Sequence, residues 1–177
     1  MSVVPSIETR LKSIAKALEQ VVVPALPSDQ RLAIEQAEIA IGHLRVLEAQ
    51  WRYVLPAARL ELAYLMELAN DLLTSDDGGV QNELAAALNA AQSVDPQDFE
   101  ALRTETLALG AVVERLIEGG DAGVSSPVAR TAILNHAARQ SRLERSWFAA
   151  AGISNAEGVP AIRELLAAEK SAFERKF

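Results

Sequence analysis

Apolar residues recur every three or four positions along most of this chain, which is the spacing of one face of an α-helix. The first segment of this kind has apolar residues at Ile7, Leu11, Ile14, Leu18 and Val21. Pro24 and Pro27 end the predicted helix, because proline lacks the backbone N–H that a helix needs. Ser28 is a candidate N-cap for a second helix. That helix is predicted to continue from residue 29 to residue 55, until Pro56 kinks or divides it.

Five further helices are predicted after Pro56, and no segment alternates like a strand. The apolar stripes of these helices lie at about 62–73, 80–91, 99–116, 127–151 and 162–173. The segment TSDDGG (74–79) predicts a surface turn, and in DPQD (95–98) Asp95 is the predicted N-cap before Pro96. Residues 1–177 are therefore expected to form a single domain. Its predicted fold is an all-α bundle of about six or seven helices, with one long pair of helices kinked at Pro56.

Three polar residues spaced by sevens interrupt the apolar pattern of the second helix, in QAEIAIGHLRVLEAQW (36–51). Gln36, His43 and Gln50 share one line, because seven residues fall only about 20° short of two full turns. Leu32, Ile39 and Val46 lie on one side of this line, and Leu44 and Leu47 on the other. We therefore expect the line to be at least partly buried between two neighbouring helices. It then either fixes the register of the helices or faces a ligand or a second subunit.

A second histidine occupies a comparable place, since His136 shares a helix face with Leu143 and Trp147. Arg139 flanks that face. With Gln140, and with His43 if the two helices are neighbours, Arg139 could form an anion-binding spot within the bundle. This helix also carries Arg130, Arg142 and Arg145. Together with Arg139 they predict a solvated face with salt bridges to glutamates, or alternatively a contact for an acidic protein partner or a phosphorylated ligand.

Composition and charge narrow the classes of function. The formal charge of −7 argues against a nucleic-acid partner, because phosphate binding needs a basic surface. The absence of cysteine excludes disulfides and thiolate metal sites, and is consistent with a cytoplasmic protein. No secretory signal or membrane span is expected. If His43 is buried without a carboxylate partner, its protonation should destabilise the fold below about pH 6.

No motif for a nucleotide loop, a nucleophile elbow or a cofactor is present, and one pattern of carboxylates remains. Glu35 and Glu38 lie one helical turn apart, and Glu67 and Asp71 follow on the helix after Pro56. Opposed in a helical hairpin, they could hold Mg²⁺. This pattern resembles the all-α nucleoside triphosphate pyrophosphohydrolases, which pair E-x-x-E with E-x-x-D. Here the second motif is out of register, because Asn70 stands where the family has aspartate.

The step VVVPALPSDQR (21–31), followed by IAIGHLRVLEAQW (39–51), resembles a group of small bacterial helical proteins of unknown function. Such proteins are often encoded beside acyl-CoA dehydrogenases and aminoglycoside-phosphotransferase-like kinases, so the resemblance implies an accessory role in acyl-CoA metabolism. It covers mainly residues 7–60 and assigns no catalytic residue. The sequence thus leaves three hypotheses: a homodimeric interaction protein, a small-ligand binder at Gln36, His43, Gln50, His136 and Arg139, or a Mg²⁺-dependent nucleotide hydrolase.

Overall fold

The structure is a computed structural model that describes residues 6–75, 81–119, 126–150 and 157–169. Within these residues all regular structure is helical, so the predicted all-α class is confirmed. The predicted turn at 74–79 falls mostly outside the described residues. The main helices are α1 (Ile7–Ala17), α3 (Arg31–Gln50), α4 (Val54–Ser75), α5 (Gln81–Gln92), α6 (Phe99–Glu118), α7 (Pro127–Ala150) and α8 (Ile162–Ala168).

The first helix does not stop at Pro24. A π-helical turn at Leu18–Val22 follows α1, and the short helix α2 (Val23–Ala25) continues from it. The N–H of Val23 donates to the carbonyl of Leu18, five residues back. This wider turn lies directly before Pro24, which has no N–H to donate. The chain leaves the helix only at Leu26, where the backbone becomes extended ahead of Pro27.

The predicted break at Pro56 lies a few residues earlier. Helix α3 ends at Gln50, a 3₁₀ turn spans Trp51–Tyr53, and α4 begins at Val54. Pro56 therefore lies in the first turn of α4, where a missing N–H leaves no helical hydrogen bond unmade. The proline divides the long predicted helix by starting a new one.

Helix α6 begins three residues later than the sequence pattern predicted. Its N-cap is Asp98, whose side chain accepts a 3.0 Å hydrogen bond from the N–H of Ala101. The side chain of Asp95, the predicted cap, instead accepts from the N–H of Gln97 at 2.8 Å and forms a turn. Two aspartates three residues apart can both cap a backbone N–H, and the sequence pattern could not rank them.

Helices α4 to α8 form a body around a shared core, with α4 in contact with α5, α6 and α7. Leu62 and Met66 of α4 and Leu102 and Leu109 of α6 are fully buried there. Beside it, α8 adds Ile162 and Leu165 to a smaller apolar cluster with Leu60, Tyr64 and Leu143. Within the described residues, the apolar stripes of α4, α5 and α6 face the shared core.

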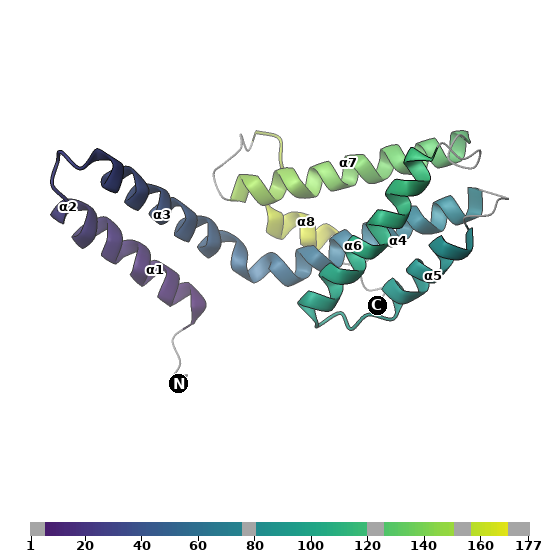
Figure 1. Cartoon of the computed structure of the whole chain (residues 1–177), viewed down its shortest axis with the longest axis horizontal. Coiled ribbons are helices and arrows are strands. Elements are labelled where there is room, and N and C mark those ends of the chain that lie inside the picture. The colour runs from purple at the N-terminus through teal and green to yellow at the C-terminus, as the bar shows by residue number, and fades with distance from the viewer. Residues whose placement is uncertain (1–5, 76–80, 120–125, 151–156, 170–177) are drawn as a thin grey trace.

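Helices α1 and α3 form an antiparallel hairpin that projects from the body (Figure 1). Along most of its length α3 packs against α1, and only its C-terminal end meets α7. Helix α4 continues beyond α3 instead of folding back along it (Figure 1). No helix among the described residues is both long and apolar enough to cross a membrane.

Candidate functional site

The structure buries one of the three residues of the predicted line, Gln36, His43 and Gln50, and exposes the other two. Gln36 and His43 are exposed on the hairpin, whereas Gln50 is only 7% exposed and donates its Nε2 hydrogen to the carbonyl of Trp147 at 2.9 Å. The line was expected to be at least partly buried, and this holds for Gln50 but not for Gln36 and His43. The predicted acid destabilisation through a buried His43 loses its premise as well.

The reason is a third apolar line on α3, which is distinct from the apolar residues predicted on the two sides of the polar line. Ile34, Ala37 and Ile41 lie roughly opposite His43, and Ile41 is buried where α1 packs. The apolar residues beside the polar line are left largely uncovered, since Leu32 and Ile39 remain more than half exposed. Helix α3 thus has one neighbour along most of its length, where the sequence analysis expected two.

His136 is a hydrogen-bonded histidine at the contact between α7 and α4. Its Nδ1 lies 3.3 Å from the backbone carbonyl of Tyr64. Burial lowers the pKa of His136, and the charge of Arg139 lowers it further, while the hydrogen bond to Tyr64 raises it. The structure does not bring His43 to this place, because His43 is exposed on the hairpin.

Arg139 is already neutralised by two carboxylates. Its guanidinium pairs with Glu67 and lies 3.5 Å from a carboxylate oxygen of Glu169. It also stacks over the ring of Tyr64, with Cζ 3.9 Å from the ring centre. These contacts join α7 to α4 and to the C-terminal end of α8. They leave Arg139 without the free charge that the predicted anion-binding spot required.

The other arginines of α7 are exposed, as expected of a solvated face. Arg142 and Arg145 line a groove of about 300 Å³ together with Gly158 and Pro160. The predicted salt bridges to glutamates are found for Arg139, while within the described residues Arg130, Arg142 and Arg145 form none.

The four carboxylates of the nucleotide-hydrolase hypothesis do not converge. Glu35 and Glu38 are exposed on α3, whereas Glu67 of α4 pairs with Arg139. Asp71 lies further along α4. The motif needs two helices opposed in a hairpin, but α3 pairs with α1, and α4 runs on beyond it (Figure 1). In the part of the chain that the structure describes, no three His, Asp or Glu side chains are grouped so that they could hold a metal ion.

The hairpin presents an apolar surface that runs along both of its helices. At about 100° per residue, Ile7 and Ile14 lie to one side of the contact between α1 and α3, and Ala40 and Leu47 lie to the same side on α3. Ile7, Ile14 and Leu47 are each about half exposed, at 54%, 49% and 51%. Val21 and Val22 extend the exposed apolar surface at the π-helical turn. We call Ile7, Ile14, Ala40 and Leu47 the apolar flank.

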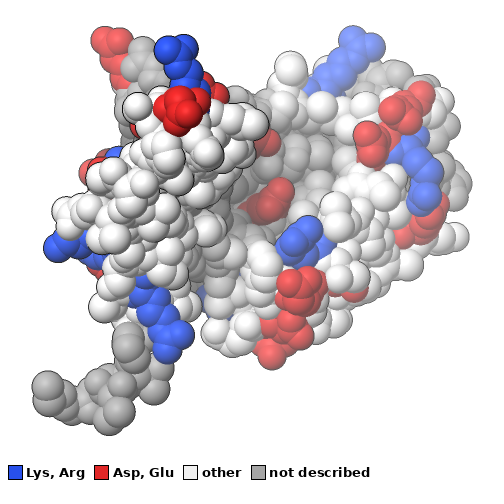
Figure 2. All heavy atoms as spheres, turned by 60° about the vertical axis from the view of Figure 1, so that its left-hand side comes forward, with Lys and Arg blue, Asp and Glu red and all other residues white. Residues whose placement is uncertain are grey.

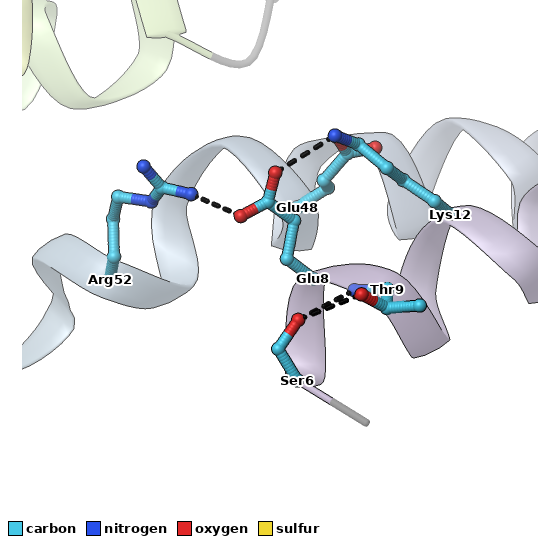
Figure 3. Close-up of polar contacts among 6 residues, drawn as sticks. All are labelled: Ser6, Glu8, Thr9, Lys12, Glu48 and Arg52. Atoms are coloured by element: carbon cyan, nitrogen blue, oxygen red, sulfur yellow. Dashed lines mark hydrogen bonds and ion pairs between the residues drawn. The ribbon is translucent and has the colours of Figure 1, made fainter. Parts of the chain in front are cut away.

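The opposite side of the hairpin carries its ion pairs. Arg45 of α3 lies 2.7 Å from a carboxylate oxygen of Glu19. Nearer the body, Glu8 pairs with Lys12 at 2.8 Å and with Arg52 at 2.5 Å, and Lys12 also lies 3.4 Å from Glu48 (Figure 3). Lys12 and Arg52 hold the pKa of Glu8 below its usual value. The ion pairs therefore gather on one side of the hairpin and leave the apolar flank without one.

The sequence pattern did not distinguish the apolar flank. Ile7, Leu11, Ile14, Leu18 and Val21 were predicted to share one face of the first helix, but of these only Leu11 and Leu18 turn toward α3. The signal that could have separated them is the spacing of seven between Ile7 and Ile14, which defines a second line beside the first. On α3, Ala40 and Leu47 show the same spacing.

Comparison of the chain with protein-family models, with curated proteins and with solved structures gives no match. The proposals below therefore rest on the geometry of the described residues.

Proposed function

We propose that this protein is a helical interaction protein that forms a homodimer through the apolar flank of the α1–α3 hairpin. The observation that carries the proposal is the half-exposed row of Ile7, Ile14 and Leu47 on one side of two packed helices. Contiguous exposed apolar surface of this kind is typical of an interface between proteins. In Figure 2 the hairpin is turned forward and shows a largely uncharged surface with charged side chains toward its margins.

A second copy of the chain fits this flank better than an acidic partner does. A two-fold axis places the same surface on both sides of an interface, so the surface must complement itself. Aliphatic side chains without charge meet this condition, and two antiparallel hairpins packed in this way form a four-helix bundle. The ion pairs of Glu19 with Arg45 and of Glu8 with Arg52 lie on the opposite side and would remain in water. None of the four residues of the flank carries a charge that would attract an acidic partner.

In the dimer, the exposed polar residues of α3 would lie at the edge of the interface. Gln36 and His43 precede Ala40 and Leu47 by four residues each, so they lie next to them around the helix, at the edge of the apolar flank. At that edge they would form the polar rim that surrounds the apolar centre of protein interfaces. Their spacing by seven then follows the length of the interface instead of marking a ligand site.

Light scattering coupled to size-exclusion chromatography tests the proposal on the full chain. We expect the mass of a dimer at a protein concentration of about 100 μM, and the mass of a monomer for Ile14→Glu, since a buried unpaired charge is costly at an interface. Leu107→Glu, at a 67% exposed position of α6, is the matched control and should remain dimeric. Ile39→Glu, on the side of α3 away from α1, should remain dimeric too.

A monomeric wild-type chain at that concentration would overturn the homodimer and favour a different protein as the partner. A dimer that persists in both Ile14→Glu and Leu47→Glu would show that the contact lies elsewhere. The cytoplasm remains our predicted compartment. The accessory role in acyl-CoA metabolism implied by the family resemblance also remains a prediction.

A further inference from the structure

A cleft of about 460 Å³ opens where the first turns of α4 and α6 meet the C-terminal half of α7. Its walls are mainly apolar, with Ala57, Ala58, Phe99, Leu143, Trp147 and Phe148 among the lining residues. Both the volume and the apolar lining are in the range of sites for small molecules, which span about 300 to 1,000 Å³.

Two carboxylates line this cleft and converge on one amide. Oε1 of Glu61 and Oε1 of Glu144 each lie 3.4 Å from Nε2 of Gln140, which is a long distance for a hydrogen bond. Among the described residues, no lysine or arginine is paired with either carboxylate. The two negative charges are therefore satisfied only weakly by the protein itself.

Among the residues that the structure describes, Arg103 is the one cation that lines the cleft. Arg103 of α6 lies over the ring of Phe99, with Cζ 6.0 Å from the ring centre. The described residues that line the cleft thus include two carboxylates and one guanidinium, so their field within it favours a positive ligand. Trp147 and Phe148 add aromatic rings, whose faces attract cations.

We propose that this cleft binds a small organic cation in which an ammonium group is attached to an apolar or aromatic body. The ammonium lies between Glu61 and Glu144, where it donates hydrogen bonds that Gln140 supplies only at long range. The apolar body lies against Phe99, Trp147 and Phe148. A ligand with a carboxylate or phosphate in the same position would instead meet two like charges.

Three probes that share one apolar body separate the charge from the hydrophobic contribution. They are 4-phenylbutylamine, 4-phenylbutanol and 4-phenylbutyrate, titrated into the full-length protein and followed by the NMR shifts of its backbone amides. We expect the amine to bind about tenfold more tightly than the alcohol, and more tightly still than the carboxylate. The shifts should lie at residues 57–61, 99–103 and 140–148. Equal affinity of the alcohol and the amine, or shifts confined to other residues, would overturn the proposal.

Two double variants test whether Glu61 and Glu144 recognise the ammonium group of the amine. The double variant Glu61→Gln with Glu144→Gln should lose about tenfold in affinity for the amine and bind the alcohol as before. The matched control is Glu114→Gln with Glu118→Gln, which removes two exposed carboxylates from α6 outside the cleft and should bind like the wild type. A similar loss in both double variants would show that only the net charge of the protein matters.

A second kind of variant tests the apolar wall. Phe148 is 46% exposed, so Phe148→Ala should leave the fold intact while weakening all three probes. Undiminished binding of the amine to Phe148→Ala would exclude this cleft. The site is separate from the apolar flank, so Ile14→Glu should bind the amine like the wild type whether or not the chain forms a dimer.

Discussion

The hairpin of α1 and α3 and the body of α4 to α8 have similar apolar spacing along their helices but bury it to different degrees. In the body, α4 contacts several helices, and Leu62, Met66 and Leu102 are fully buried. In the hairpin each helix has one main neighbour, and Ala15 and Ile41 are the buried apolar residues. The comparison teaches that a periodic stripe predicts a helix reliably, whereas its burial depends on how many neighbours the helix finds.

The largest expected effect compares one leucine from each region. Leu62→Ala in the body should lower the free energy of unfolding by about 2 to 5 kcal/mol, because a cavity remains in a packed core. Leu32→Ala in the hairpin should change it by less than about 0.5 kcal/mol, since Leu32 is 70% exposed. Urea denaturation followed by circular dichroism, at one protein concentration, measures both. Equal losses would break the comparison, because Leu32 would then have to be buried.

The next effect concerns the hydrogen bond that joins the hairpin to the body. Gln50→Ala removes the donor to the carbonyl of Trp147 and should lower the free energy of unfolding by about 1 to 3 kcal/mol. Gln36→Ala removes the same amide from an exposed position of α3 and should cost less than about 0.5 kcal/mol. Chemical denaturation compares the two variants, and a similar change in both would mean that the Gln50 contact contributes little.

A smaller effect separates a half-buried ion pair from an exposed one. Arg139→Gln removes the pairs with Glu67 and Glu169 and the stacking on Tyr64, and should cost about 1 to 2 kcal/mol. Arg45→Gln on the hairpin breaks the exposed pair with Glu19 and should cost less than about 0.5 kcal/mol. Thermal unfolding at low and at high salt provides the measurement. A larger loss for Arg45→Gln would contradict the ranking.

The smallest effect is a dependence of stability on pH through His136. Burial lowers its pKa in the folded state below the ordinary value of 6.5, so between the two values the unfolded chain binds more protons. The contribution of His136 is fully present above pH 6.5 and is lost as the pH falls through the lowered pKa. His136→Asn should flatten the stability profile below pH 6.5, and His43→Asn, at an exposed position, should retain it. Parallel profiles for the wild type and His136→Asn would contradict this prediction.

The helices themselves could be predicted from the sequence, but the partner of α3 could not. Its apolar residues occupy almost every side of the helix, so periodicity alone cannot decide whether α1 covers Ile41 or Ile39. The burial of Gln50 was expected. Its partner is a backbone carbonyl of α7, which a pattern of side chains cannot predict. The ion pair of Arg139 with Glu169 likewise depends on where α8 docks, and the sequence holds no local signal for that.

The body of the protein was easier to anticipate for the same physical reason. Leu84 and Leu88, the two large apolar residues of α5, lie with Ala91 on one narrow stripe, and all three are buried as expected. A narrow stripe leaves one way to bury apolar area, whereas a wide one leaves several. The cleft beside Trp147 had no sequence signal, because its lining residues come from three helices that only the fold brings together.

The 3₁₀ turn at Trp51–Tyr53 lies at the base of the hairpin, so a small rotation there would move the far end of the hairpin by a large distance. Helix α3 has 20 residues and is therefore roughly 30 Å long. A rotation of about 10° at the turn displaces the far end of the hairpin by roughly 5 Å, while Gln50 at the near end hardly moves. The turn thus influences the angle at which the apolar flank stands relative to the cleft and, in the proposed dimer, the spacing of the two clefts.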